Sequence, residues 1–373
     1  MAGLVLVLTV GCATAPQGAR RLPATPAPEP VISTGGGLAV TAPGFGVRVR
    51  GNRLVDLAGR EVRLLGANRS GTQYACAEGD GIFDGPVDDR AIAVMASWKM
   101  TAVRVSLNEN CWLGINGVRP AYAGSRYRAA IVAFVRRLNA RRLYVVLDLH
   151  WSAPGRTKAL DQTVMPDRDH APAFWRSVAA TFARNPAVVF DLFNEPFPDH
   201  NHNTTAAWTC VRNGGRCPGV GFAAAGMTEL LRQVRAVHAT NVVLVGGPQY
   251  AGMVDRWRQF APADPARQLA ASIHIYLPHY SPCDSLACWN RTVAPLAARV
   301  PVVIGEFGAK DCTGAAVTAL MRWADAHHVS YLAWAWFTGS CAGEPALISS
   351  YNGTPTRYGA AVRDHLRALA RGH

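Results

Sequence analysis

Apolar runs with the character of buried β-strands alternate with helical patterns along most of this chain. There are eight such runs, at residues 62–68, 101–107, 143–150, 187–195, 241–247, 271–276, 300–308 and 330–336. Between them, residues 126–142 and 222–240 repeat apolar positions at the spacing of an amphipathic helix. Strands that are apolar throughout and separated by helices are typical of a parallel sheet covered on both faces.

Eight strand and helix units between residues 47 and 368 predict a single (β/α)₈ TIM barrel with enlarged βα loops. The 373-residue chain is 49% apolar, which is enough for one large domain or two ordinary ones. A doubly wound open sheet is the alternative. Such a sheet would more often carry G-x-G-x-x-G after its first strand, and GANRSG at 66–71 lacks that spacing. A short β-hairpin, starting at Val47 and turning at 58–60, is expected before the barrel.

The beginning of the chain predicts export. Residues 2–10 are apolar and too few to span a bilayer, but they suit the apolar region of a signal peptide. The segment TVGC at 9–12 loosely resembles a bacterial lipobox, in which Cys12 would be lipidated. Thr9 stands where leucine is preferred, and no basic residue precedes the apolar run. Lipid anchoring, simple secretion and an incidental apolar start therefore all stay open for residues 1–12.

Residues 13–43 are rich in alanine, proline, threonine and glycine. A segment of this composition buries too little apolar surface to fold, so we expect a linker. The folded, catalytic domain is expected to occupy residues 44–373. The protein is expected to be extracellular or attached to the bacterial cell surface.

Eight further cysteines follow the expected export signal, and an even number in that setting indicates disulfides. Sequence alone does not fix their pairing. Short loops favour Cys210–Cys217 and Cys283–Cys288, which leaves Cys76–Cys111 and Cys312–Cys341 as the simplest remainder. A metal site is disfavoured, because there is no CxxC pair and no cluster of histidine with cysteine. We expect neither a metal nor another cofactor.

The formal net charge is +13, and it comes almost entirely from arginine, since lysine occurs only at Lys99, Lys158 and Lys310. The arginines are scattered along the chain, whereas a nucleic-acid site more often shows a clustered basic stripe. We therefore interpret the excess charge as a solvated surface and expect no nucleic-acid partner. Weak adhesion to acidic surfaces is the alternative.

Polar side chains stand at the carboxyl end of almost every predicted strand, which is the end that carries active sites in such barrels. These residues are Asn68, Arg104, His150, Asn194, Glu195, Gln249, His274, Tyr276, Glu306, Trp334 and Trp336. Two glutamates surrounded by an arginine, histidines, a tyrosine and a tryptophan are difficult to explain by packing.

A pair of carboxyl groups suits the cleavage of a glycosidic bond. One protonated acid gives a proton to the leaving oxygen, while a second, ionised carboxylate attacks or assists at the anomeric carbon. Carboxyl groups about 5 Å apart retain the anomeric configuration, and groups about 6.5–9.5 Å apart invert it. The fourth and seventh strands face each other across an eight-stranded barrel, so Glu195 and Glu306 are expected at the shorter distance.

Six motifs in order resemble glycoside hydrolase family 5, the cellulase-like retaining enzymes built on a (β/α)₈ barrel. They are VRV at 103–105, LDLHW at 147–151, NEP at 194–196, HIY at 274–276, GEFG at 305–308 and WAW at 334–336. The resemblance covers the chain from about residue 62 to its end and implies that Glu195 is the acid/base and Glu306 the nucleophile.

The resemblance also implies roles for four neighbours. Asn194 would contact the sugar 2-hydroxyl, His150 and His274 would line the subsite of the attacked sugar, and Trp334 would lie under that sugar. Trp336 points the same way as Trp334 by strand alternation. From the residues themselves, Arg104 and Tyr276 should favour the charged form of Glu306, while Glu195 should be less well paired with cations.

One stretch departs from the family pattern. SLNENCWLGING at 106–117 is expected to place Asn108, Glu109 and Trp112 near the rim of the pocket, with Cys111 tethering the loop. Glu109 could bind a sugar hydroxyl or pair with a surface arginine, and Trp112 has a packing role as an equal alternative. Trp151, beside His150, offers an indole that suits the apolar face of a pyranose ring, with a packing role as the alternative.

These observations predict a secreted or surface-anchored retaining β-glycoside hydrolase acting by double displacement, with an endo-β-1,4-glucanase as the leading expectation. The alternatives are a β-mannanase, an exo-acting β-glycosidase, a non-catalytic carbohydrate-binding barrel and a basic adhesion protein. The expected partner is a β-linked oligo- or polysaccharide. We expect membrane contact only through an anchor at Cys12, and a monomer.

Overall fold

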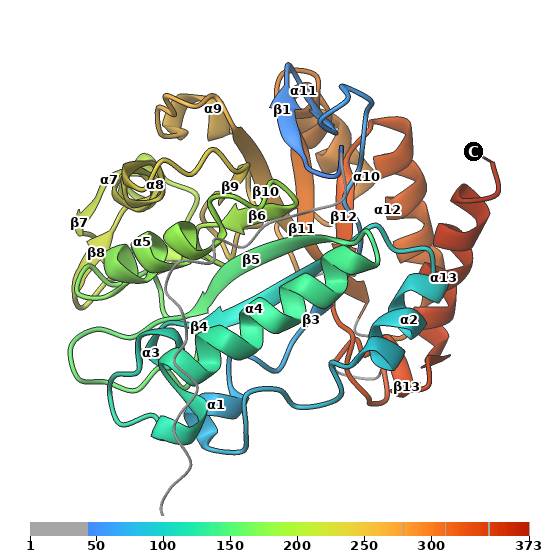
Figure 1. The fold of residues 1–373 in the computed structure, drawn as a ribbon. Helices are drawn as coiled ribbons and strands as arrows, with labels where there is room; N and C mark the ends of the chain where they lie inside the picture. Colours follow the sequence, from blue (N-terminus) through green and yellow to red (C-terminus); the bar gives the residue numbers. More distant parts are fainter. Residues whose placement is uncertain (1–43, 279, 310, 342–343, 373) are drawn as a thin grey trace, which may run out of the picture. The chain divides into compact units, whose positions relative to one another are not determined.

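The computed structural model describes residues 44–278, 280–309, 311–341 and 344–372. Eight parallel strands close into a barrel in the order β10-β11-β12-β3-β4-β5-β6-β9 (Figure 1). The strands are β3 (Leu65–Arg69), β4 (Ala102–Asn108), β5 (Tyr144–Trp151), β6 (Val188–Asp191), β9 (Val243–Gly246), β10 (Leu269–Leu277), β11 (Val302–Ala309) and β12 (Ser330–Ala333). The predicted TIM barrel is confirmed. The expected signal segment 1–12 with Cys12 and the expected linker 13–43 lie outside the described residues.

Every predicted strand run overlaps one barrel strand, but β6 and β12 end several residues before their predicted runs do. β6 ends at Asp191, so Asn194 and Glu195 lie in the loop that follows it. β12 ends at Ala333, so Trp334 and the residues after it lie beyond the strand. The expectation that Trp336 points the same way as Trp334 relied on strand alternation, which does not apply beyond Ala333.

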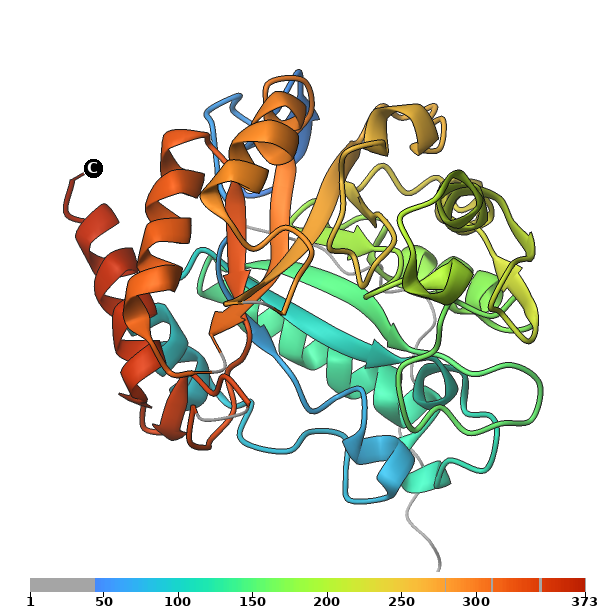
Figure 2. The same ribbon diagram turned by 180° about the vertical axis from the view of Figure 1, so that it is seen from behind.

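Helices surround the barrel. The predicted helix at 126–142 is α4 (Ser125–Ala140), whose buried face carries Ile131, Phe134, Val135 and Leu138. The helix predicted at 222–240 is wrong at its start, because β8 (Ala223–Ala225) pairs with β7 (Gly214–Arg216) and α8 occupies only Met227–Ala236. The other helices of the outer layer are α2 (Asp89–Ser97), α5 (Ala171–Phe182), α11 (Ala294–Ala297), α12 (Gly314–Ala326) and α13 (Arg357–Leu369). From either side, α12 and α13 lie next to each other (Figures 1 and 2).

The predicted hairpin exists, but its turn was misplaced. β1 (Arg48–Arg50) and β2 (Arg53–Val55) are joined at Gly51 and Asn52, where Gly51 adopts a φ of 61°. The segment 58–60 instead forms a second turn, in which the Asp56 carboxylate accepts the backbone N–H groups of Ala58 and Arg60. Short polar side chains that accept local backbone donors favour such turns.

The hairpin segment closes the amino-terminal end of the barrel. Phe45, Val47 and Leu54 are buried against Tyr144 and other residues at the starts of the strands. The opposite, carboxyl-terminal end therefore remains as the place for a site, as in other barrels of this kind.

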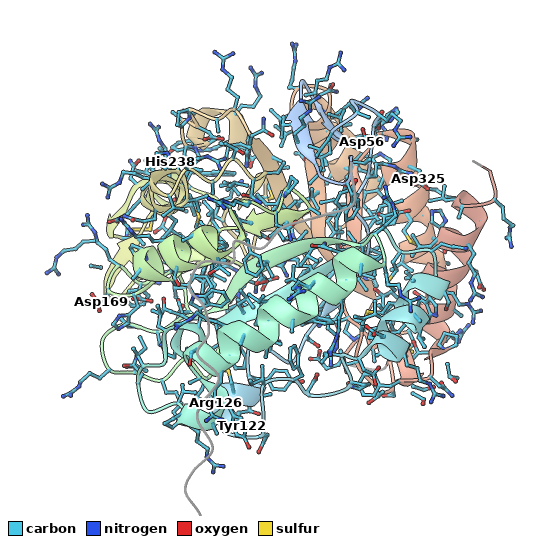
Figure 3. The ribbon with its side chains drawn as sticks, in the orientation of Figure 1. Asp56, Tyr122, Arg126, Asp169, His238 and Asp325 are labelled. Atoms are coloured by element: carbon cyan, nitrogen blue, oxygen red, sulfur yellow. A yellow bond between two sulfur atoms is a disulfide. The ribbon has the colours of Figure 1, made fainter. Side chains whose placement is uncertain are left out.

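All four expected disulfides are present: Cys76–Cys111, Cys210–Cys217, Cys283–Cys288 and Cys312–Cys341. Cys76–Cys111 joins α1 (Ala75–Glu78) to α3 (Glu109–Leu113), two short helices that follow β3 and β4. Side chains ending in nitrogen point outward on several sides of the ribbon (Figure 3), in agreement with a dispersed basic surface.

Candidate active site

A cavity of about 460 Å³ lies at the carboxyl-terminal end of the barrel. Its lining includes seven residues predicted from the strand ends, namely His150, Asn194, Glu195, Gln249, Tyr276, Glu306 and Trp334. Eight further lining residues were not predicted, namely Gln162, Asn201, Tyr250, Tyr280, Ser281, Pro282, Glu344 and Pro345. Asn201 ends the short helix α6 (Pro198–Asn201), and the other seven belong to loops, where no periodic pattern marks the direction of a side chain.

Arg104 is the centre of a buried polar network beneath this cavity. Its side chain is fully buried, and it directs Nε to Asp191, Nη1 to Asn68 and Glu306, and Nη2 to Asn194 and Asp148, at 2.7–3.1 Å. A guanidinium has five N–H donors, and these five acceptors match that number. Arg104 therefore contacts Glu306 as predicted. Asn68 is also buried and accepts a hydrogen bond from Arg104, so it belongs to the same network.

The sequence did not predict Asp148 and Asp191 as residues of the site. Both are buried and both contact Arg104, so one guanidinium faces three carboxyl groups. Burial raises the pKa of Asp191 to about 7 in spite of the opposing effect of Arg104. The signal was available, since an aspartate inside an apolar strand, as in LDLHW, needs a buried cation or donor.

Glu306 accepts hydrogen bonds on both carboxylate oxygens. Arg104 Nη1 donates to Oε1 at 2.7 Å, and the Tyr276 hydroxyl donates to Oε2 at 2.6 Å. Burial and the charge of Glu306 raise the pKa of Tyr276 well above its ordinary value, so the phenol keeps its proton. A carboxylate that receives a charged and a neutral donor is stabilised in its ionised form.

Glu195 has a different environment, with neutral partners. Its Oε1 lies 2.8 Å from Nδ1 of His274, and Gln162 Nε2 donates to its Oε2 at 3.0 Å. Burial lowers the pKa of His274 to about 4, so this imidazole is neutral near pH 7. Burial also raises the pKa of Glu195, and the hydrogen bond from Gln162 opposes that shift.

The two glutamates lie close together. One oxygen of Glu195, one oxygen of Glu306 and one ring nitrogen of His274 are all within 4.8 Å of one another. His150 lies nearby, with Nδ1 at 2.9 Å from Asp148, and its ring stacks on Trp334 with centroids 5.4 Å apart. The predicted placement of His150, His274 and Trp334 around the glutamates is thus present, while their roles stay predictions.

Five residues expected at or near the pocket are absent from its lining, and three of them are buried in the core around it. Asn108 is buried beneath the loop, where it caps α3 and donates to the carbonyls of Gln73 and Ala159. Trp336 is buried against Trp98, because β12 ends before it and the chain turns away from the cavity. Trp112 is also a core residue, and its indole N–H donates to Ser177.

Trp151 is partly exposed at the end of β5, with its ring 6.2 Å from that of Tyr74, and it is absent from the cavity lining. Glu109 neither reaches the rim nor pairs with an arginine. It is fully buried, and its carboxyl group faces that of Asp167. Burial and the charge of Asp167 raise the pKa of Glu109 well above its ordinary value, so Glu109 holds the proton between them.

Two groups of side chains among the described residues bring three possible metal ligands within 4.8 Å of one another. One is the set of Glu195, His274 and Glu306, whose atoms already bond to each other and to their neighbours. The other is Asp167, Asp169 and His170, of which Asp169 is labelled in Figure 3. Across the described ranges, the helices are too short or too polar to cross a bilayer.

Comparison with known sequences identifies the family of this barrel. Residues 55–340 match the profile of the cellulase family, glycosyl hydrolase family 5. An endoglucanase from Halalkalibacter akibai is 24% identical over 210 residues, which is 54% of this chain and 22% of the relative. Endoglucanase CelA from Streptomyces lividans is 24% identical over 340 residues, which is 86% of this chain and 64% of the relative. The chain thus spans less than two thirds of either relative.

Solved structures with the same fold include enzymes named for two polysaccharides. A β-glucanase from Saccharophagus degradans, solved with cellotetraose, has a TM-score of 0.66 at 19% identity and covers 87% of this chain and 93% of its own. A β-mannanase from Streptomyces thermolilacinus, solved with mannohexaose, has a TM-score of 0.62 at 21% identity and covers 88% and 96%. At these identities the similarity establishes the fold alone.

Proposed function

Since this chain belongs to the cellulase family, glycosyl hydrolase family 5, we propose that it hydrolyses β-1,4-linked glucan internally and with retention of anomeric configuration. The observation that carries this proposal is the close approach of Glu195 and Glu306, with one oxygen of each within 4.8 Å. Retaining glycosidases hold their carboxyl groups at about 5–5.5 Å, whereas inverting enzymes need room for a water molecule between them.

The surroundings of the two glutamates support different roles. Glu306, held by Arg104 and Tyr276, is the nucleophile, because both partners stabilise its charge. Glu195, whose pKa is raised by burial, is the general acid. In the first step Glu306 attacks the anomeric carbon, the glycosidic bond breaks, and Glu195 gives its proton to the leaving oxygen.

In the second step Glu195 acts as a general base instead of a general acid. Its carboxylate takes a proton from water, the water oxygen attacks the anomeric carbon, and the bond to Glu306 breaks. Glu195 therefore cycles between protonated and ionised forms in each turnover. Neutral partners such as His274 and Gln162 suit this cycle better than a fixed cation, which would favour the ionised form in both steps.

The substrate is tested by incubating purified protein with carboxymethylcellulose, mixed-linkage β-glucan, β-mannan and aryl β-glycosides. Endo action on glucan predicts early products of several sizes, whereas exo action releases one sugar per event. Glu306→Gln, tested in parallel, should be inactive on every substrate. Activity in that variant would show that Glu306 is not the nucleophile, whereas a wild type that binds these substrates without cleaving them would indicate a carbohydrate-binding role.

A β-mannanase is the second candidate, because a solved β-mannanase shares the fold at a TM-score of 0.62. Glucose and mannose units differ in the configuration of the 2-hydroxyl. The amide of Asn194, which lines the cavity and accepts from Arg104, is suited to contact that hydroxyl. Initial rates on cello- and manno-oligosaccharides of equal length separate the two candidates.

We also propose that the protein is exported and anchored through Cys12. The four disulfides support an oxidising compartment, since disulfides are rare in cytosolic proteins. Fractionation of the producing cells should place the protein with membranes, and Cys12→Ala should release it into the medium. Recovery of the wild-type protein from the cytosol would contradict export, and release of both proteins would indicate simple secretion.

A further inference from the structure

The β5–α5 loop, residues 152–170, brings a side chain onto Glu195 that the cleavage chemistry alone does not require. Nε2 of Gln162 donates one hydrogen to Oε2 of Glu195 at 3.0 Å and the other to the backbone carbonyl of Glu195 at 3.1 Å. Both atoms are acceptors when Glu195 is ionised, so the amide nitrogen must face them. Gln162 thus fixes the side chain of Glu195 relative to its own backbone.

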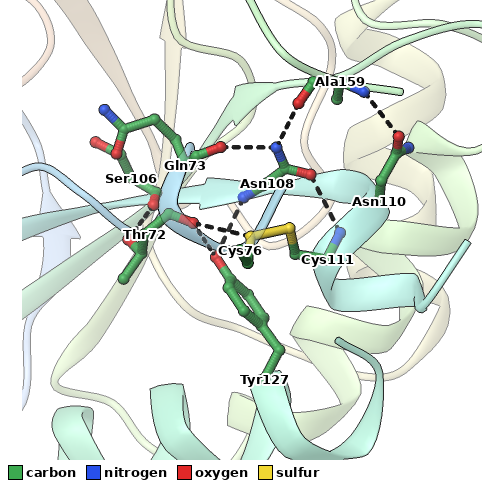
Figure 4. Close-up of a disulfide and its surroundings, with 9 residues drawn as sticks. All are labelled: Thr72, Gln73, Cys76, Ser106, Asn108, Asn110, Cys111, Tyr127 and Ala159. Atoms are coloured by element: carbon green, nitrogen blue, oxygen red, sulfur yellow. Dashed lines mark hydrogen bonds between the residues drawn. A yellow bond between two sulfur atoms is a disulfide. The ribbon is translucent and has the colours of Figure 1, made fainter. Parts of the chain in front are cut away.

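The loop that carries Gln162 is held by the stretch that departs from the family pattern. Asn108 donates to the carbonyl of Ala159 at 2.9 Å, and Asn110 accepts from the N–H of the same residue at 2.8 Å (Figure 4). The disulfide Cys76–Cys111 ties this stretch to α1 (Figure 4). Ala159 lies three positions before Gln162. The bonds to its carbonyl and N–H groups therefore fix the backbone close to the Gln162 side chain.

Two more contacts hold the loop at the two residues that follow Gln162. The hydroxyl groups of Ser152 and Thr163 lie 3.0 Å apart, and the carbonyl of Val164 accepts the N–H of Phe197 at 3.0 Å. Phe197 follows Glu195 by two residues, so the loop is bonded to the same segment as the glutamate that Gln162 contacts. A loop of this length with so many anchors is typical of a functional loop.

We propose that Gln162 is a positioning residue for the acid/base Glu195, and that the Asn108–Cys111 stretch serves this reaction by holding the loop that presents it. The proposal rests on the proposed glycosidase function. Gln162 orients the carboxyl group while it is protonated and stabilises its charge when it acts as a base. The charged and titratable groups that also face Glu195 are Arg104, Asp148, His150, Tyr250, His274, Tyr276 and Glu306.

The first test needs no substrate. The carboxyl carbon of Glu195 in ¹³C-glutamate-labelled protein, identified as the signal lost in Glu195→Gln, is titrated by NMR. Gln162→Met keeps most of the volume and removes both donors, so it should move the pKa of Glu195 upward. Gln259→Met, at an exposed glutamine far along the chain, is the matched control and should leave it unchanged. An unchanged pKa in folded Gln162→Met would overturn the proposal.

The anchoring is tested by Asn110→Ala, which removes the acceptor of the Ala159 N–H. It should shift the Glu195 titration in the same direction as Gln162→Met. The double variant should shift it no further than Gln162→Met alone, because both changes act on one contact. Additive shifts would show that the stretch does not act through Gln162.

Kinetics supply a second, independent test. With 2,4-dinitrophenyl β-cellobioside the first step needs no acid, so kcat/KM of Gln162→Met should stay within about 2-fold of the wild type. The second step needs the base, so kcat and KM should fall together by about 10-fold. If kcat and KM of Gln162→Met both equal those of the wild type, the proposal is contradicted. An inactive wild type would instead contradict the proposed function, and the NMR titration would still decide the role of Gln162.

Discussion

The nucleophile side and the acid/base side of this site are built from different parts of the fold. Glu306 and its partners Arg104 and Tyr276 all stand on barrel strands, and a guanidinium provides the charge. Glu195 lies in a loop beyond β6, and one of its two partners, Gln162, comes from another loop. One side is a buried ionic network on a rigid sheet, and the other pairs a loop-borne glutamate with two neutral side chains, His274 from β10 and Gln162 from a tethered loop.

This difference corresponds to what each glutamate has to do. A nucleophile keeps one charge state until it forms a bond, and fixed cationic donors on strands maintain that state without rearrangement. An acid/base changes its protonation twice per turnover, so strong pairing with a cation would slow the protonated half of the cycle. Substitutions on the two sides are therefore expected to differ in kind as well as in size.

The largest effect is expected for Arg104→Lys. Lysine keeps the charge but has three donors in place of five, so at least two of the five acceptors lose their partner. We expect kcat/KM to fall by about 10²–10³-fold and the free energy of unfolding to fall by about 1–3 kcal/mol. The exposed Arg258→Lys is the control. Near-normal kinetics and stability would show that the network does not support Glu306.

A smaller effect is expected for Tyr276→Phe, which removes one neutral donor from Glu306 and leaves Arg104 in place. We expect kcat to fall by about 10–100-fold, because the hydroxyl stabilises the carboxylate that leaves in the second step. Thermal unfolding should change little. If kcat is unaffected while the melting temperature drops, the hydroxyl has a structural role only.

The smallest effect is expected outside the two glutamates, at the buried carboxyl pair of Glu109 in α3 and Asp167 in the β5–α5 loop. The raised pKa of Glu109 means that the folded protein keeps a proton that the unfolded chain loses above the ordinary value of 4.5. Stability from this group therefore falls as pH rises from that value through the folded pKa. Glu109→Gln has nearly the same shape and is neutral at every pH, so it has no proton to lose.

The melting temperatures of the wild type and Glu109→Gln are compared from about pH 4.5 to pH 8. As pH rises, the melting temperature of the wild type should fall relative to that of Glu109→Gln. The change should be a few degrees, because only one titrating group differs between the two proteins. Glu61→Gln, at a partly exposed residue, is the control. A difference that is independent of pH would show that Glu109 is not protonated in the folded state.

The strand-borne half of the site was predictable because strands have a period. Arg104, His150, Tyr276 and Glu306 are polar positions within or at the end of apolar runs, and the barrel brings the carboxyl ends of its strands to one face. The loop-borne half was not. Gln162 lies in a loop with no period, and its approach to Glu195 depends on hydrogen bonds to Ala159 that no local pattern encodes.

The wrong predictions have the same origin. Trp336 was placed in the pocket by extending strand alternation beyond Ala333, where the strand ends. Asn108 was placed at the rim because it follows a strand, but it caps α3 instead. A polar residue after a strand can serve the next helix as well as a pocket, and the two uses look alike in sequence.

The central claim is that Glu306 is the nucleophile and Glu195 the acid/base of a retaining enzyme. It is tested most directly by azide rescue of Glu306→Gly and Glu195→Ala with 2,4-dinitrophenyl β-cellobioside, with product configuration read by NMR. In Glu306→Gly, azide replaces the carboxylate and should yield the α-glycosyl azide. In Glu195→Ala, azide should attack the glycosyl-enzyme and yield the β-glycosyl azide. The same anomer from both variants, or an initial α-product from the wild type, would contradict this assignment.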